Sequence, residues 1–345
     1  MGKRAGSGNR TWRHLAVGLL IAAGALFLAY RKTDFSELMA AVSEMSWPLL
    51  LLVLPPLAFS YFCRILQWRV LLSPISRVSM GDSSGPLLTG FMLNSILPGR
   101  VGEVARALLL SRRTAVPRAA SFATVVLARL LDGLTLAGMT LVVLAVLQSR
   151  LDNTIRMGLF AAGAMYAGVL ILLVALRRWK EGAARSISSP LAWLGLKGLA
   201  SKVEKLLISF SHGLEVMTSW KHLALAVLYS VLVWGSLAVS VIPVFAAMHM
   251  EFVWYYPLLV LILAGLGMLI PTPAGTGTVH GALVLVMPGL LGISVETVRV
   301  FALVFHTSQF LPIILAGLVT AIREGVTPSY LGRISGSDLE TPADA

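Results

Sequence analysis

Long apolar runs alternate with short polar gaps along most of the chain. An apolar run of about 20 residues is long enough to cross a bilayer as a helix. Two further apolar runs, 87–97 and 282–287, are too short to cross, so we expect half-helices there. The pattern predicts an all-α polytopic membrane protein with about seven transmembrane helices and two re-entrant half-helices. The seven expected spans are 15–29, 47–62, 121–147, 157–176, 222–248, 254–270 and 297–322.

The composition supports a protein of the membrane. Hydrophobic residues make up 57% of the chain and charged residues only 13%, whereas soluble domains carry roughly a quarter of charged residues. The formal net charge is +12, but the basic residues lie between apolar runs, which indicates orientation in a bilayer and not nucleic-acid binding. Most of them fall in 1–14, 63–120 and 177–221, so we place these segments in the cytoplasm of a protein of the plasma (bacterial inner) membrane.

We expect one transmembrane domain over 15–322, with a cytoplasmic N-terminus at 1–14 and a polar tail at 323–345. Within this domain, 177–221 combines basic residues with an apolar stripe at helical spacing, which predicts a cytoplasmic amphipathic segment on the membrane surface. The single cysteine, Cys63, excludes an intramolecular disulfide and a thiolate metal cage. We expect no metal and no cofactor.

The apolar pattern is first interrupted at 94–106, N-S-I-L-P-G-R-V-G-E-V-A-R. Pro98 and its neighbouring glycines should end a helix that enters from Pro86. Three charged residues then recur at intervals of three, on roughly one face of a resumed helix: Arg100, Glu103 and Arg106. A broken apolar helix with ionisable groups at its mouth is typical of a polar cavity in a membrane protein. A loop with a solvated basic face is the alternative.

A second interruption follows at 271–278, P-T-P-A-G-T-G-T. It aligns with the first without a gap, because P-G-R-V-G-E-V from Pro98 stands against P-A-G-T-G-T-V from Pro273. Two corresponding interrupted segments indicate a transporter's binding site between repeats. Chance similarity between two breaks rich in Gly and Pro is the alternative.

The alignment predicts two pseudo-repeats, 15–147 and 222–322. If both half-helices return to the side from which they enter, the repeats are parallel and related by an axis along the membrane normal. If 271–292 crosses the membrane, the repeats are inverted.

Ionisable side chains also occur within or beside the expected spans. Arg129 and Asp132 are three residues apart on one helical face, so they can neutralise each other and must face the bundle interior. A structural role and a ligand-binding role stay equally open for this pair. Arg64 and Arg69 follow the second span, where snorkelling to lipid headgroups is the alternative to a role in the site.

Two histidines lie at or near the second half of this arrangement. His280 stands beside the second break and His306 within the last span. Both could titrate near neutral pH if they line the cavity. An uncharged, hydrogen-bonded histidine in the core is the alternative.

Helix ends at such breaks attract ions. The N-terminus of a half-helix carries positive partial charge and free amides, which suit a phosphate, and Arg100 and Arg106 would add charge-assisted hydrogen bonds. This chemistry predicts a site for a phosphate-bearing lipid headgroup, with the acyl chains left in the bilayer. The candidate binding residues are Asn94, Arg100, Glu103, Arg106, Arg129, Asp132, Arg64, Arg69, Thr272, Thr276, Thr278, His280 and His306.

Four blocks carry a resemblance to a known family: R-I-L-Q-W-R at 64–69, the stretch 94–106, A-R-L-L-D-G-L at 128–134, and P-T-P-A-G-T-G at 271–277. On these blocks the chain resembles, over nearly its whole length, the flippase-like transmembrane family named for the lysylphosphatidylglycerol synthase membrane region. The resemblance implies lipid translocation, as in proteins that move aminoacylated phosphatidylglycerol between leaflets. It implies no synthase activity, because no soluble aminoacyl-transfer domain is present.

This chain departs from the family's usual pattern at two positions. The family typically has a glutamate where this chain has His280, and often an arginine near the position of His306. These departures imply a different headgroup or a different proton coupling.

Three functions remain open on the sequence. The favoured one is a flippase or transporter of a membrane phospholipid or lipid-linked substrate, driven by an ion gradient or a partner because no nucleotide-binding loop is present. The second is a membrane-embedded transferase acting on lipid headgroups, for which Glu103 and Asp132 are the candidate acids. The third is a non-catalytic accessory subunit. A homo-oligomer or a partner lipid-modifying enzyme would fit the first.

Overall fold

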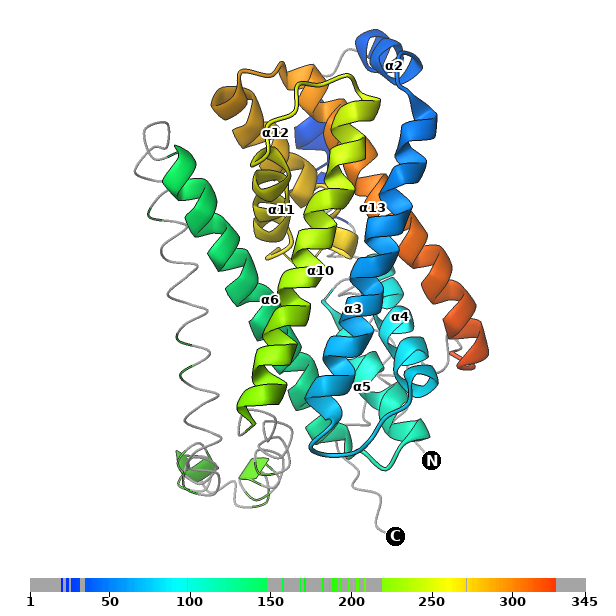
Figure 1. Cartoon of the computed structure of the whole chain (residues 1–345), viewed down its shortest axis with the longest axis vertical. Helices are drawn as coiled ribbons and strands as arrows, with labels where there is room; N and C mark the ends of the chain where they lie inside the picture. The colour runs from blue at the N-terminus through cyan, green and yellow to red at the C-terminus, as the bar shows by residue number, and fades with distance from the viewer. Residues whose placement is uncertain are drawn as a thin grey trace. The chain divides into compact units, whose positions relative to one another are not determined.

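The computed structural model describes residues 35–97, 99–147, 219–270 and 272–326, with scattered positions between 20 and 31 and between 157 and 208. All regular structure in these residues is helical (Figure 1). The elements are α2 (Phe35–Ser43), the 3-10 helix η1 (Trp47–Val53), α3 (Leu54–Leu72), α4 (Met80–Ile96), α5 (Val101–Arg113), α6 (Arg118–Leu147), α10 (Trp220–Ala247), α11 (Tyr256–Gly267), the 3-10 helix η3 (Pro273–Gly275), α12 (Thr278–Leu291) and α13 (Val295–Arg323). The expected spans 15–29 and 157–176, the N-terminus 1–14, the segment 177–221 and most of the tail lie largely or wholly outside the described residues.

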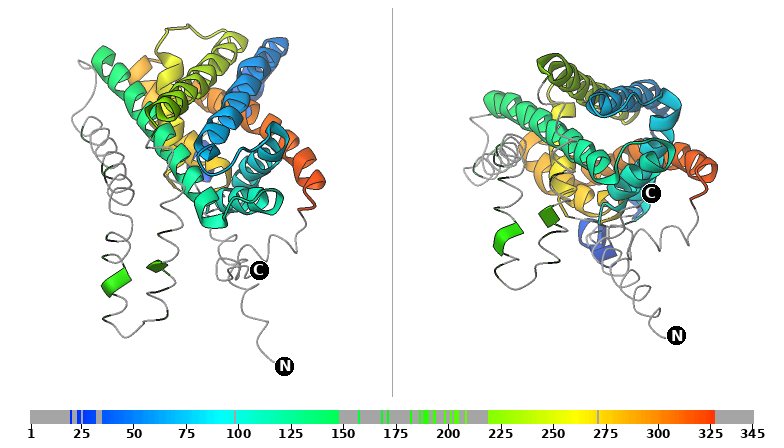
Figure 2. Two further views of the ribbon diagram at one scale, coloured as in Figure 1. Left: turned by 60° about the horizontal axis from the view of Figure 1, so that its bottom comes forward. Right: turned by 90° about the horizontal axis from the view of Figure 1, so that it is seen from below.

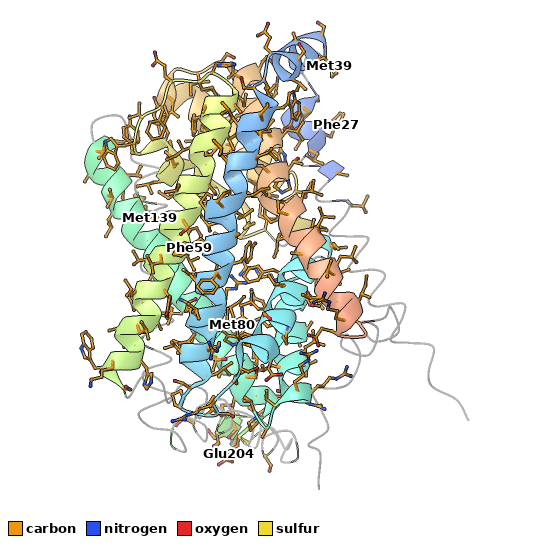
Figure 3. The ribbon with its side chains drawn as sticks, turned by 45° about the vertical axis from the view of Figure 1, so that its right-hand side comes forward. Phe27, Met39, Phe59, Met80, Met139 and Glu204 are labelled. Atoms are coloured by element: carbon orange, nitrogen blue, oxygen red, sulfur yellow. The ribbon has the colours of Figure 1, made fainter. Side chains whose placement is uncertain are left out.

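Within the described ranges, five helical stretches are long and apolar enough to cross a membrane: Trp47–Leu72, Arg118–Leu147, Trp220–Ala247, Pro273–Leu291 and Val295–Arg323. Their outer faces carry large apolar side chains, such as Phe59, which is 48% exposed on α3 (Figure 3). Lipid tails can cover such side chains, whereas water would leave them poorly solvated. The chain is therefore an integral membrane protein, and the part that the structure describes is all-α.

The second expected span, 47–62, ends too early. In the structure η1 continues directly into α3, and one candidate span runs from Trp47 to Leu72. Arg64 and Arg69 therefore lie inside the helix and not beyond its end. The helix continues through Arg64 because that side chain is buried and bonded within the protein.

The helices around the two breaks also differ from expectation. The expected span 254–270 contains only the short helix α11, whose Tyr256–Gly267 is too short to cross. The short run 282–287 extends in both directions into α12, which passes through Pro288 and ends beside Gly292, a left-handed residue with φ 68°. With Pro273–Leu291 long enough to cross, the inverted arrangement of repeats stays open alongside the parallel one.

The helix before the first break begins earlier than expected. It starts at Met80, and Pro86 lies within it. The Ser79 hydroxyl accepts a hydrogen bond from the Asp82 backbone N–H at 3.0 Å, so the start of α4 is capped ahead of the proline. This cap, worth about 1 kcal/mol, stabilises the first turn of a helix that continues through Pro86.

The described residues belong to two compact units. The first unit comprises 1–58, 85–106 and 237–345, and the second comprises 59–84 and 107–236. Both breaks fall in the first unit. In it, α12 packs against α11 and α13, and α13 also packs against α2. The expected division into repeats 15–147 and 222–322 stays a prediction.

Hydrogen bonds between helices hold the second unit together. The Ser60 hydroxyl donates to the Val233 carbonyl at 3.2 Å, and the Trp68 indole N–H donates to Thr124 Oγ1 at 2.9 Å. Each of these side chains is buried. Paired polar groups of this kind hold apolar helices in one register.

Each break in the first unit joins two helices that approach closely at a glycine. Figure 2 shows α4 and α5 lying beside each other, and a Cβ added to Gly102 would overlap the Gly90 carbonyl oxygen. Between α11 and α12, a Cβ on Gly267 would come within 2.7 Å of Val279 Cα. Each break and the two helices that it joins form a hairpin: α4 with α5, and α11 with α12. Both hairpins depend on a glycine inside a helix, where the missing side chain lets two backbones meet.

Gly102→Ala should destabilise the protein by about 2 kcal/mol, because the clash with backbone exceeds the ~1 kcal/mol that alanine gains in a helix. The control is Gly281→Ala on α12, where nothing lies within 4 Å of the added Cβ. This control should leave the protein unchanged or slightly more stable. Free energies of unfolding in a mild detergent test the pair, and equal values for both variants would contradict the close approach.

Candidate functional site

The first break leaves helical geometry at residues next to Pro98. The helix α4 ends at Ile96 and α5 begins at Val101. Between them Gly99 and Arg100 have φ values of 79° and 54°. Arg100 therefore precedes α5, so the expected common helical face of Arg100, Glu103 and Arg106 is wrong for its first member. Glu103 and Arg106 do lie on α5.

The second break repeats this backbone conformation. Ala274 and Gly275 have φ values of 52° and 70°. In the gap-free alignment these two residues stand against Gly99 and Arg100, so each break contains two consecutive left-handed residues at matching positions. A left-handed residue other than glycine costs on the order of 1 kcal/mol. Arg100 and Ala274 carry that cost, one in each break.

One hydrogen bond connects the two breaks. The exposed Arg100 guanidinium donates through Nη2 to the Met268 carbonyl oxygen at 3.1 Å. Met268 is the C-terminal cap of α11, which is the helix that leads into the second break. A cation at a helix C-terminus also interacts favourably with the unpaired carbonyls there. Arg100 therefore belongs to the first break and contacts the end of the helix that leads into the second.

The threonines of the second break bond mainly to the break itself. Thr272 Oγ1 and Thr278 Oγ1 lie 3.2 Å apart, and Thr278 Oγ1 donates to the Gly275 carbonyl at 3.0 Å. These bonds stabilise the turn ahead of α12. Thr276 is half-buried in the same turn. Of the three hydroxyls expected to bind a ligand, two thus have a structural role as well.

The two histidines lie against each other. The ring centroids of His280 and His306 are 4.7 Å apart, and the Tyr30 ring meets the His280 ring edge-on at 5.8 Å. His306 Nε2 lies 3.1 Å from the Ala274 carbonyl oxygen. Since a carbonyl only accepts, this nitrogen carries the hydrogen. His306 therefore supports the left-handed residue of the second break.

Asn94 and Arg106 lie where α4 meets α5. Asn94 Oδ1 is buried and would be 2.7 Å from a Cβ added to Gly102. Arg106 is buried, and its Cβ would be 2.8 Å from a Cβ added to Gly90. Both side chains therefore belong to the interior of the first hairpin.

A separate group of charged residues occupies the second unit. Asp132 on α6 is 5% exposed and Arg64 on α3 is 9% exposed. Asp132 Oδ2 accepts from Arg64 at 2.8 Å and from Arg129 at 3.2 Å, and Oδ1 accepts from the Trp234 indole N–H at 3.1 Å. The snorkelling alternative for Arg64 is therefore wrong, because its charge is buried against Asp132.

Arg69 does not join the Asp132 group. Its Nε donates to the Val78 carbonyl at 3.0 Å, in the connection between α3 and α4. Its side chain is half-exposed. The guanidinium thus stabilises the connection between α3 and α4 and does not bond to the other candidate residues of its unit.

Three residues at these sites were missed in the sequence. Tyr30 donates to the Arg299 carbonyl at 2.9 Å, and Arg299 Nε donates to the Ala29 carbonyl at 2.8 Å. Trp234 could have been noticed, because it lies midway along an apolar span and not at a membrane interface, where tryptophan usually occurs. Tyr30 gave no such signal, since its partner is a backbone atom distant in sequence. Arg299 was visible in the sequence only as a charge near the start of the last expected span.

Within the described ranges, no three His, Cys, Asp or Glu side chains come together as a metal site would require. The arrangement instead offers hydrogen-bond donors at two irregular turns. Such turns hold small polar groups and oxyanions well.

Comparison with known protein families gives a match over most of the chain. Residues 15–317 match the family described as the lysylphosphatidylglycerol synthase TM region. No curated protein matches the chain in a sequence comparison.

His306→Phe should lower the free energy of unfolding by about 1–3 kcal/mol, because the Ala274 carbonyl would lose its donor in a partly buried position. His306→Gln should cost less, since its amide N–H can occupy nearly the position of Nε2. Thermal and denaturant unfolding of the purified variants measure the difference. A phenylalanine variant as stable as the glutamine variant would show that the hydrogen bond does not support the break.

Proposed function

The chain belongs to the family of the lysylphosphatidylglycerol synthase TM region, and on this premise we propose that it moves a phosphate-bearing lipid or lipid-linked headgroup between membrane leaflets. The observation that carries the proposal is the hydrogen bond from Arg100 to the Met268 carbonyl, which connects the two breaks. Both breaks interrupt apolar helices of one unit, so their irregular backbone lies together.

Irregular backbone at membrane depth is stable only where protein or water satisfies its polar groups. Transporters use such interruptions in corresponding halves of the chain to build a substrate site. The matched pairs of left-handed residues, Gly99 with Arg100 and Ala274 with Gly275, support this correspondence. The two hairpins would then be re-entrant elements, or a re-entrant element and a crossing one, around a polar passage.

The donors at the breaks suit an anionic headgroup. Each break is followed by a helix, α5 or α12, whose N-terminal amides favour negative charge. The exposed guanidinium of Arg100 adds a charge-assisted donor next to them. Glu103 in the first turn of α5 would orient arginine or compete with the anion for it. The acyl chains would stay in the bilayer against the apolar outer faces of the helices.

The distribution of Lys and Arg supports an orientation with the N-terminus in the cytoplasm. The membrane would be the plasma membrane, which in bacteria is the inner membrane. Since the resemblance concerns lipid translocation, the passage would connect its two leaflets.

Arg100→Gln should slow translocation at least about tenfold, because a hydrogen bond to a charged partner is worth ~1.5–3 kcal/mol. The assay follows fluorescent phosphatidylglycerol between leaflets of proteoliposomes through its accessibility to a membrane-impermeant quencher. Glu103→Gln should also change the rate, as the neighbouring acid is removed from the site.

Arg113→Gln is the matched control, because Arg113 is exposed in the last turn of α5, away from the break. Its rate should stay at the wild-type value. If stable Arg100→Gln and Glu103→Gln proteins both move lipid at wild-type rates, the site is elsewhere. Mass spectrometry of lipid that copurifies with the wild-type protein, compared with Arg100→Gln, identifies what the site holds.

A further inference from the structure

His280 has the most unusual surroundings of the polar side chains at the second break. It lies in the first turn of α12 and is 1% exposed. Its ring is covered by His306 on one side and approached edge-on by Tyr30. A polar ring placed so deeply should have a partner for each of its nitrogens.

The backbone of the break determines which nitrogen carries the hydrogen. The Gly277 N–H points at His280 Nδ1, 3.4 Å away, so Nδ1 accepts. In a neutral imidazole the other nitrogen is then the donor. His280 Nε2 therefore presents an N–H and offers no lone pair.

In the described part of the chain, this N–H has no acceptor. His280 Nε2 is buried and makes no hydrogen bond. The hydroxyl of its neighbour Tyr30 donates to the Arg299 carbonyl, and His306 Nε2 donates to the Ala274 carbonyl. Buried donors without partners are rare in folded proteins, and each needs an explanation such as a water or a ligand.

The charges nearby limit what that ligand can be. Residues 268–291, which comprise the second break and α12, contain no Asp or Glu. The nearest acid that follows in the chain, Glu296, is paired with Arg299. The Arg100 guanidinium reaches into the same region at Met268. An oxyanion would find donors here, whereas an ammonium group would find no carboxylate in the second break, because the acid of the proposed site, Glu103, belongs to the first break.

We propose that the second break binds an anionic phosphodiester headgroup that carries no ammonium, and that His280 Nε2–H donates to one of its oxygens. This rests on the proposed function and makes its substrate more specific. The protein thus prefers a lipid such as phosphatidylglycerol over its cationic aminoacylated derivative. His280 determines that preference by supplying a donor where a carboxylate would select the ammonium.

The test measures binding of two short-chain lipids, dihexanoyl phosphatidylglycerol and its lysyl derivative, to the full-length protein in nanodiscs. Three variants change only the chemistry at one position. His280→Gln keeps an N–H donor, His280→Leu removes it, and His280→Glu replaces it with an acceptor. Thermal unfolding and size-exclusion chromatography verify that each variant is folded.

The wild-type protein should bind the phosphatidylglycerol more tightly than the lysyl derivative. His280→Leu should weaken phosphatidylglycerol binding about tenfold, and His280→Gln should stay within about threefold of wild type, as the loss or retention of one hydrogen bond predicts. His280→Glu should reverse the preference between the two lipids. Should His280→Leu fail to fold, the lipid preference of the wild-type protein and of the Gln and Glu variants still tests the inference.

Equal binding of both lipids by the wild-type protein would overturn the inference, as would a preference that none of the folded variants alters. In the second case the buried N–H holds a structural water only. The proposed function fails separately: a wild-type protein that shows the preference but moves no lipid in proteoliposomes binds the headgroup without translocating it. A protein that moves both lipids equally well translocates without this selection.

Discussion

Backbone that leaves a helix inside an apolar segment must find its hydrogen bonds within the protein, because lipid supplies none. The first unit meets this requirement around the second break with side chains from the first break, α12 and α13. The carbonyl oxygens there receive donors as follows: Met268 from Arg100, Ala274 from His306, and Gly275 from Thr278. The polar residues that first suggested a binding site thus also make an irregular turn possible. Any role in binding depends on the donor capacity that remains after these bonds.

The positions of both breaks could be predicted from the sequence, because each combines proline with two nearby glycines, although other helices continue through Pro86 and Pro288. The left-handed backbone that the two breaks share was not predicted, since Arg100 was expected to lie on a resumed helix. The ends of helices were harder to predict. Arg64 was expected to mark the end of a span, yet the helix continues because Asp132, 68 residues away, accepts its charge. A one-dimensional pattern shows a charge but not its partner.

The contacts of the site could be predicted least. His280 and His306 were each considered alone, whereas in the structure their rings are neighbours. Tyr30 was not considered, although its hydroxyl bonds to a backbone carbonyl 269 residues later. Such contacts depend on how helices pack, and helix packing depends on small residues such as Gly102 and Gly267 whose effect is visible only in three dimensions. Residue types therefore indicated the chemistry of the site, and the fold determined which of those residues are in contact.

The two units use their polar groups in different ways. In the second unit Asp132 accepts from side chains of three helices through both of its oxygens, so its bonding capacity goes into holding α3, α6 and α10 together. A carboxylate engaged in this way is poorly placed for acid or base catalysis, which weighs against a transferase. In the first unit most side-chain bonds at the breaks go to backbone carbonyls, and His280 Nε2 keeps an unused N–H. Binding capacity in the described structure is therefore concentrated at the breaks of the first unit, where the backbone itself is least regular.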